Sequence, residues 1–337
     1  MLRIATTYES RLGRNDGNPL YVQACLKRMQ YYVGIHGGLG PNHDLDSWFA
    51  DGMPDARADE SAKNLWEKTK ELLEVDHIYP TGDLSPFGKY DLNIHTDWGE
   101  DALVGILPYK VIDTPRPMAY WASDTHISNG LAGDSYPYRL SMAKKADYAF
   151  CAQKRAVEEM KKDGVNAIWL PHAVEPQAYP KFDILTKKYD VCFVGHVNTR
   201  NREDALDRLF SEFPNFYYGQ ALFNEAARKF AESKICFNIA MTDDLNMRNF
   251  EVMATGSFLL TSWIPTIEEL FEDGKHLVLY RSMDEMVDKA KYYLKHDDER
   301  EKIAQAGYEE VMKKHTIQHR VDVILNEYLN SRKLVSA

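Results

Sequence analysis

The chain has 337 residues, of which 44% are hydrophobic and 27% are charged. This is the composition of an ordinary globular protein, long enough for two domains of about 150 residues each. Its 41 basic and 51 acidic residues give a formal net charge of −10, which argues against a general binder of nucleic acid or anionic membranes. The N-terminus lacks a signal-peptide pattern, and no apolar run approaches the length of a membrane span, about 18 residues. Cys192 and Cys236 lie in apolar, strand-like runs. We therefore expect a cytoplasmic protein with buried free thiols.

In the first half of the chain, short apolar runs alternate with amphipathic stretches. The apolar runs predict strands at 2–8, 90–96, 116–122, 148–153 and 167–173. Apolar positions at helical spacing predict helices at 19–32, 61–75, 139–146 and 154–164. Prolines followed by charged residues at 174–188 are typical of a linker. We therefore place a first domain at 1–173.

The second half repeats this alternation. Strands are predicted at 189–197, 215–220, 234–241, 257–263 and 276–280. Helices are predicted near 203–212, 223–232 and 316–331, and a further short helix carries Arg248 and Glu251 and ends before Thr255. A second domain therefore spans 189–317. Because strand and helix alternate in both halves, the sequence predicts two Rossmann-like, doubly wound α/β domains that face a cleft.

Polar residues follow the first predicted strand of the second domain. Gly195 and His196 lie at its C-terminal end, and Arg200 and Arg202 follow in the loop before a helix. Ligands of open α/β sheets bind at the carboxyl ends of strands, and a helix N-terminus with arginines favours anions. A simple turn with solvated arginines is an equally good interpretation of these residues alone.

A second polar stretch, TDDLNMRNFEVMATGSFLLT, follows the strand at 234–241. Asp243 and Glu251 are separated by seven residues, so a loop carboxylate and a helix carboxylate can converge on one ligand, with Glu251 suited to the two hydroxyls of a ribose. Arg248 adds a cation near the helix start, where a phosphate would bind, and Asn249 follows it. The alternative is an acidic cap that complements the helix dipole. The Arg-x-x-Glu pattern exceeds what capping needs and favours function.

The segment MRNFEVMATGSFLLT resembles the donor-site signature of GT-B glycosyltransferases, and the resemblance runs from about 217 to 323. The family is the "glycosyl transferases group 1"-like domain of proteins related to spore-maturation glycosyltransferases. The resemblance implies that Glu251 binds the ribose of a nucleotide-sugar and that Gly256 forms the turn after the helix. Asp243 stands where many retaining members have the first Glu of a glutamate pair. It implies a donor site made of Gly195, His196, Arg200, Tyr218, Asp243, Arg248, Asn249 and Glu251.

In this fold the first domain binds the acceptor, and the last helix, about 318–337, packs back on it. The most unusual stretch of the first domain is AYWASDTHISNG, where Asp124 and His126 follow a predicted strand. An Asp-x-His pair can deprotonate an acceptor hydroxyl or orient the group that does, although a packed histidine and a capping aspartate are equally good interpretations. We predict Asp124 and His126 as catalytic residues, and the absence of zinc-ligand spacing predicts no metal.

The leading hypothesis is a hexosyltransferase-type enzyme that needs no cofactor or metal and transfers the sugar of a nucleotide-sugar, such as UDP-glucose, with retention. The acceptor stays open: a glycan, a small molecule, a protein or a modified DNA base all fit. A nucleotide-sugar epimerase on the same fold and a non-catalytic bilobal binding protein are the alternatives. A dehydrogenase is disfavoured because G-x-G-x-x-G does not follow the first strand of either domain.

Overall fold

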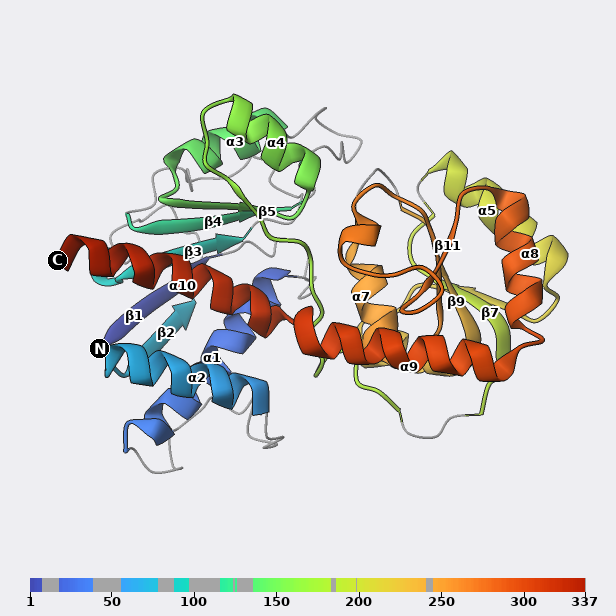
Figure 1. Cartoon of the computed structure of the whole chain (residues 1–337), viewed down its shortest axis with the longest axis horizontal. Helices are drawn as coiled ribbons and strands as arrows, with labels where there is room; N and C mark the ends of the chain where they lie inside the picture. Colours follow the sequence, from blue (N-terminus) through green and yellow to red (C-terminus); the bar gives the residue numbers. More distant parts are fainter. Residues whose placement is uncertain are drawn as a thin grey trace. The chain divides into compact units, whose positions relative to one another are not determined.

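The computed structural model describes residues 1–7, 18–38, 56–77, 88–96, 116–123, 125, 136–182, 186–197, 199–240 and 245–336. The chain divides into two compact units, residues 1–171 with 317–337, and residues 172–316. Each unit is an α/β domain whose described strands form one parallel sheet (Figure 1). Within the described part of the chain, no helix combines the length and the apolar character that a membrane crossing requires.

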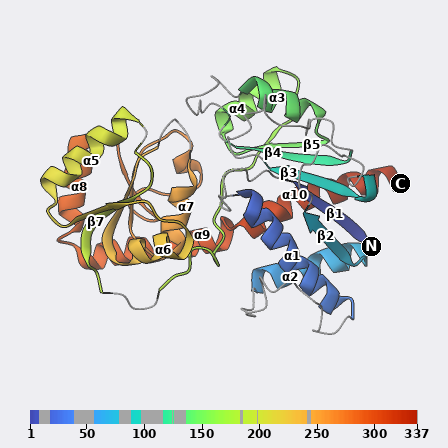
Figure 2. The same ribbon diagram turned by 180° about the vertical axis from the view of Figure 1, so that it is seen from behind.

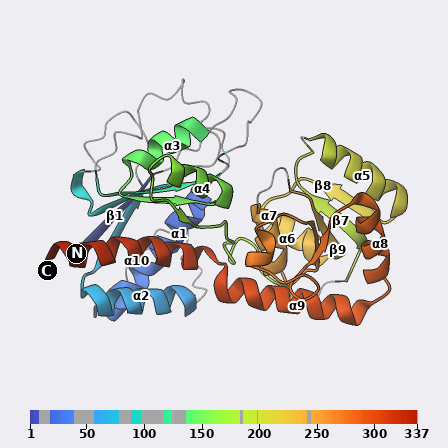
Figure 3. The same cartoon turned by 45° about the horizontal axis from the view of Figure 1, so that its top comes forward.

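The first unit has a six-stranded sheet in the order β2-β1-β3-β4-β5-β6. Its strands are β1 (Leu2–Thr7), β2 (Leu73–His77), β3 (Leu92–Thr96), β4 (Met118–Ala122), β5 (Tyr148–Cys151) and β6 (Ile168–Trp169). Its helices are α1 (Asn18–His36), α2 (Ala56–Thr69), α3 (Tyr136–Lys145), α4 (Lys154–Lys162) and α10 (Ile317–Ser336). Figure 3 shows α3 and α4 over one face of the sheet and α2 and α10 on the other side.

The C-terminal helix α10 is bonded to the helices of this unit. The Cys25 thiol donates to Oε1 of Gln318 at 2.9 Å, and the Ser61 hydroxyl donates to Oδ2 of Asp322 at 2.9 Å. These contacts join α10 to α1 and α2. Residues 317–337 therefore belong to the first unit, although they follow the second in sequence.

The helix predicted at 61–75 is wrong at its C-terminal end. Helix α2 stops at Thr69, Lys70 has a φ of 54°, and Leu73–His77 is strand β2, paired with β1. Leu73 and Val75 are buried and Glu74 between them is not, which is the alternation of a strand. Leu72 and Leu73 also continue the helical spacing of Leu65 and Trp66, so periodicity alone did not locate the break.

The second unit has a five-stranded sheet in the order β11-β10-β9-β7-β8. Its strands are β7 (Tyr189–Val194), β8 (Phe216–Gly219), β9 (Ser233–Asn238), β10 (Leu259–Ser262) and β11 (Val278–Tyr280). Its helices are α5 (Arg200–Glu212), α6 (Phe223–Ala231), α7 (Met247–Ala254), α8 (Met283–Tyr293) and α9 (Asp297–Lys314), with a 3₁₀ turn at Ile267–Glu269. Figure 2 shows α5 and α8 together on one side of the sheet, with α6 and α7 on the other.

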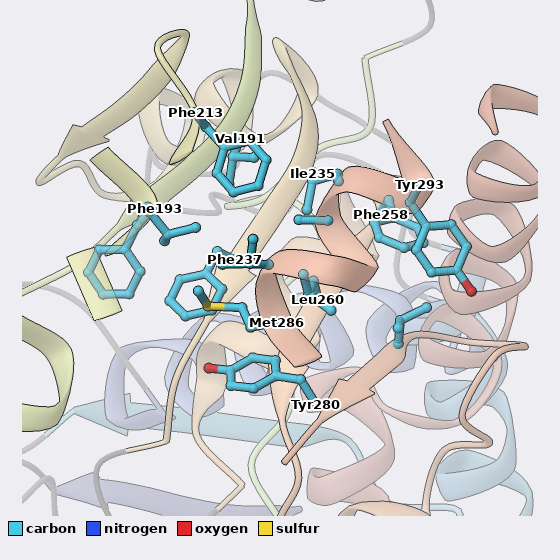
Figure 4. Close-up of a cluster of buried hydrophobic side chains, with 14 of the residues drawn as sticks. Val191, Phe193, Phe213, Ile235, Phe237, Phe258, Leu260, Tyr280, Met286 and Tyr293 are labelled. Atoms are coloured by element: carbon cyan, nitrogen blue, oxygen red, sulfur yellow. The ribbon is translucent and has the colours of Figure 1, made fainter. Parts of the chain in front are cut away.

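A core of aromatic and aliphatic side chains fills the space between this sheet and helices α5 and α8 (Figure 4). Phe193, Phe237 and Tyr280 come from three strands, with ring centroids 6.0 Å apart for the first pair and 5.5 Å apart for the second. Cys192 and Cys236 are paired neighbours in β7 and β9, and both are buried free cysteines, as predicted. The core fixes the strands whose carboxyl ends carry the polar residues of interest.

At Gly307, helix α9 packs closely against the backbone of His276 and the side chain of Met253. A Cβ atom there would lie 2.3 Å from the His276 carbonyl oxygen and 3.2 Å from Sδ of Met253 in α7. We expect Gly307→Ala to lower the free energy of unfolding by about 1–2 kcal/mol, since overpacking outweighs the better helix propensity of alanine. Chemical denaturation measures the change. Lys302→Ala, on the exposed side of α9, should stay within about 0.5 kcal/mol of the unsubstituted protein. An unchanged free energy of unfolding in Gly307→Ala would show that α9 can shift to accommodate the methyl group without loss of stability.

Candidate functional site

The sheet of the second unit changes direction between β7 and β9. Strand β8 lies on one side of β7, while β9, β10 and β11 follow in order on the other. In open α/β sheets, ligands bind where the strand order reverses, at the carboxyl ends of the two strands. The segment after β7 contains Gly195 and His196, and the segment after β9 leads into α7, which carries Arg248 and Glu251. The structure therefore brings the two predicted polar stretches to one edge of the same sheet.

The start of α7 is held to the sheet by a cluster of buried amides. Nδ2 of Asn238, the last residue of β9, lies 3.3 Å from Oδ1 of Asn246, 3.2 Å from Oδ1 of Asn249 and 3.1 Å from Oγ1 of Thr261. The backbone oxygen of Asn238 accepts a bond of 3.1 Å from the Tyr280 hydroxyl. Asn249 was predicted to bind a ligand, but its amide group is buried and bonded to Asn246 and Asn238. We assign it to positioning α7.

Arg248 and Glu251 form an ion pair within α7. Nη1 of Arg248 lies 2.7 Å from Oε2 of Glu251, and the two side chains are 17% and 8% exposed. The guanidinium also lies over the Phe230 ring of α6, 5.1 Å from its centroid. Burial opposes the charge of Arg248, but Glu251, Tyr179 and Cys192 together outweigh the effect of burial and raise the arginine's pKa. The Arg248–Glu251 pair is therefore held close together and only slightly exposed to water.

Tyr179, which sequence reasoning missed, contacts this pair from the segment that precedes β7. Burial raises the pKa of its hydroxyl, and the nearby Glu251 carboxylate raises it further. The tyrosine is therefore protonated and able to donate a hydrogen bond. No signal in the sequence marks it, because a lone tyrosine after a proline-containing stretch is equally typical of packing.

Helix α7 ends in a tight turn. Gly256 has a φ of 70°, a left-handed conformation that glycine adopts without strain. Its amide donates to the Met253 carbonyl at 2.9 Å, and a Cβ atom would lie 2.9 Å from Cε of Lys181. The backbone conformation therefore favours the glycine expected at this turn, whereas the flexible Lys181 side chain could move away from an added Cβ.

After β7, the two arginines of the sequence motif have different environments. Arg200 begins α5, is 82% exposed, and pairs with Asp204 at 3.1 Å. Arg202 is buried and donates to two backbone carbonyls, those of His196 and Ile239, at 2.9 Å each. Helical spacing distinguishes them, since Arg202 shares the apolar face of α5 with Leu206 and Leu209.

The remaining predicted residues of this edge are half-buried or exposed. Gly195 donates its amide to the Gly219 carbonyl at 3.0 Å, and His196 is exposed. Tyr218 in β8 is 37% exposed, and its ring stacks on Phe193 at 6.2 Å. An exposed aromatic ring beside a sheet edge is able to stack on a planar ligand.

Residues 185–326 match the sequence profile of the family described as glycosyl transferase-like. Most of the second unit is therefore similar in sequence to the glycosyl transferase-like family. The match includes β7, β9 and all of α7, and hence Gly195, Arg200, Arg248 and Glu251. No curated protein sequence matches the chain.

Solved structures with the same architecture cover the whole chain. Sucrose-phosphate synthase from Thermosynechococcus elongatus matches with 10% identity and a TM-score of 0.60, over 100% of both chains. Anabaena HepE in complex with UDP and glucose matches with 13% identity and a TM-score of 0.63, over 98% of this chain and 100% of that one. A glycosyltransferase from Rickettsia africae matches with 10% identity and a TM-score of 0.53, over 97% of both. The chain therefore has the GT-B fold, with residues 172–316 as one of its two Rossmann-like units and residues 1–171 with 317–337 as the other.

Three predicted site residues lie outside the described residues: Asp124 and His126 after β4, and Asp243 after β9. Near the first two, the amide and hydroxyl of Thr125 both donate to Oε1 of Gln153, so the chain after β4 is attached to the residue before α4. Among the described residues, no group of three or more His, Cys, Asp or Glu side chains is arranged to hold a metal ion. The catalytic pair therefore stays a prediction from sequence.

Proposed function

We propose that this protein is a glycosyltransferase that moves a hexose from a nucleotide-sugar to an acceptor hydroxyl. The observation that carries the proposal is the placement of the Arg248–Glu251 pair on the helix that follows β9, at the strand-order reversal of a glycosyl transferase-like domain. A carboxylate and a guanidinium three residues apart match the hydroxyls and phosphates of a nucleotide. HepE has been solved with UDP-glucose, which makes UDP-glucose the first donor to test.

Glu251 has the role of accepting hydrogen bonds from the ribose. A carboxylate offers about four lone-pair positions, so its contacts with Arg248 and Tyr179 leave room for a hydroxyl donor. Arg248 then faces the phosphates, with Arg200 and the N-terminus of α5 across the strand-order reversal. Positive charge here stabilises the nucleoside diphosphate that leaves.

In the reaction, the bond between the sugar's anomeric carbon and the β-phosphate oxygen breaks, and a bond to the acceptor oxygen forms. The acceptor proton passes to a base, for which Asp124 and His126 are our candidates from sequence. We propose retention of configuration and no requirement for a metal or a resident cofactor, as the family resemblance implies. The acceptor, whether glycan, small molecule, protein or DNA base, is left to experiment.

A titration with UDP-, GDP- and ADP-glucose in the presence of EDTA tests the proposal. One donor should raise the melting temperature, by the equivalent of about 2.7 kcal/mol when it is at 100 times its dissociation constant. NMR of the products then shows the configuration of the transferred sugar. An isomerised donor formed without any acceptor would favour the epimerase, and no response to any nucleotide-sugar would remove the proposal.

A further inference from the structure

Arg202 is a buried cation placed at the strand-order reversal. It is 8% exposed, and its two Nη atoms donate to the carbonyls of His196 and Ile239 at 2.9 Å each. His196 lies two residues after the end of β7, and Ile239 lies directly after β9. One guanidinium therefore joins the two segments that begin the candidate donor site.

The charge of Arg202 has no carboxylate partner among the described residues. The charged and titratable groups near it are Arg248 and Tyr280, and its guanidinium lies 5.8 Å from the Phe193 ring centroid. Burial first, and Arg248 second, lower the pKa of Arg202. Its Nε is buried with no hydrogen-bond partner within the described chain. Packing alone does not call for such a residue, because an apolar side chain of similar volume would avoid the desolvation of the charge.

The contact with His196 also fixes the direction of the next amide. In a planar trans peptide, the C=O and the following N–H point in opposite directions. With the His196 carbonyl directed at Arg202, the N–H of Val197 points away from the guanidinium. That N–H donates to no group in the described part of the chain. It is a backbone donor at the edge of the sheet, close to the N-terminus of α5, where an anion binds best.

We propose that Arg202 is a positioning residue for the terminal phosphate of the donor's diphosphate, an inference that rests on the proposed function. Through the two carbonyls it orients the Val197 amide and the start of the segment leading to α7, and its unpaired charge is balanced when the diphosphate binds. It contacts the protein backbone, and the phosphate is bound by the groups that it holds in place.

The test compares nucleoside diphosphates with their monophosphates. UDP, GDP and ADP are titrated by calorimetry, and the one that binds is compared with its own monophosphate. Lysine keeps the charge but lacks the planar fork that reaches two carbonyls. Arg202→Lys should therefore weaken diphosphate binding about tenfold or more and change monophosphate binding little. Glu251→Gln should weaken both by the same factor, because the ribose is common to both ligands.

Arg208→Lys is the matched control, since Arg208 is a partly exposed arginine on the same helix that pairs with Glu212 and Asp284. It should leave both affinities unchanged. Equal weakening of diphosphate and monophosphate by Arg202→Lys, or no weakening, would make Arg202 a structural residue and overturn the inference, while the proposed function stands. If none of the three diphosphates binds the unsubstituted protein, both proposals fail together.

A second measurement needs no variant and covers the case in which Arg202→Lys does not fold. In the unsubstituted protein, the Val197 amide proton should shift downfield in the NMR spectrum when the diphosphate is added, and much less with the monophosphate. The same small shift with both ligands would contradict the proposed orientation of this amide.

Discussion

Replacing Glu251 with alanine is expected to weaken nucleotide-sugar binding about 100-fold, since it removes an acceptor for two ribose hydroxyls and each hydrogen bond to a charged group contributes about 1.5–3 kcal/mol. The same change leaves Arg248 without its partner at 2.7 Å. We therefore also expect the free energy of unfolding to fall by about 3 kcal/mol, because both side chains are largely buried. Calorimetric titration gives the first quantity and chemical denaturation the second.

A double variant separates these two effects. Arg248→Met with Glu251→Leu removes both charges and fills the space with apolar side chains, which restores most of the stability but none of the binding. Glu225→Ala, an exposed glutamate on the neighbouring helix α6, is the control and should change neither quantity. Unchanged nucleotide-sugar affinity in Glu251→Ala would show that the ribose is bound elsewhere, and the assignment of the donor site to α7 would be wrong.

The alternation of strands and helices predicted most of both sheets, because in parallel sheets each strand is a short apolar run separated from the next by an amphipathic helix. Strand β2 was missed for a local reason. Leu65, Trp66, Leu72 and Leu73 fit one helical stripe, and nothing in the residue types of Thr69 and Lys70 requires the left-handed turn that ends α2. The order of the strands was not readable, because it depends on contacts between segments distant in sequence.

The candidate site was predictable where the residue type itself is unusual. Glu251 and Arg248 stand out because a short, buried helix rarely carries both, and the structure places them side by side. Asn249 was predicted from the same stretch, and its amide oxygen lies 3.2 Å from Nδ2 of Asn238 at the end of β9. Arg202 and Arg200 look alike in the sequence. Only their positions around helix α5 distinguish them, because Arg202 lies on the buried face and Arg200 does not.

The amide cluster at the start of α7 leads to the other large expected effect. Asn238→Asp changes almost nothing in shape, but it replaces a buried amide donor with an oxygen that faces Oδ1 of Asn246 and Oδ1 of Asn249. We expect the free energy of unfolding near pH 7 to fall by about 3 kcal/mol, from lost hydrogen bonds and a buried charge. The Asn215→Asp control is exposed and also donates one amide bond, to the Lys188 carbonyl at 2.9 Å, so it should lose much less.

The pH dependence identifies the cause. Burial raises the pKa of the new carboxyl in the folded state above its unfolded value of about 3.9. An acid whose folded pKa is raised adds a charge-dependent loss only when it is ionised. That part of the loss is absent below about pH 4, grows as the pH rises, and is complete above the folded pKa. Denaturant titrations at several pH values between about 4 and 7 follow the difference between Asn238→Asp and the unsubstituted protein. A loss independent of pH would mean that the missing hydrogen bonds, and not the buried charge, dominate. A loss no larger than that of Asn215→Asp would mean that the start of α7, and with it the Arg248–Glu251 pair, is held in place by something other than these amides.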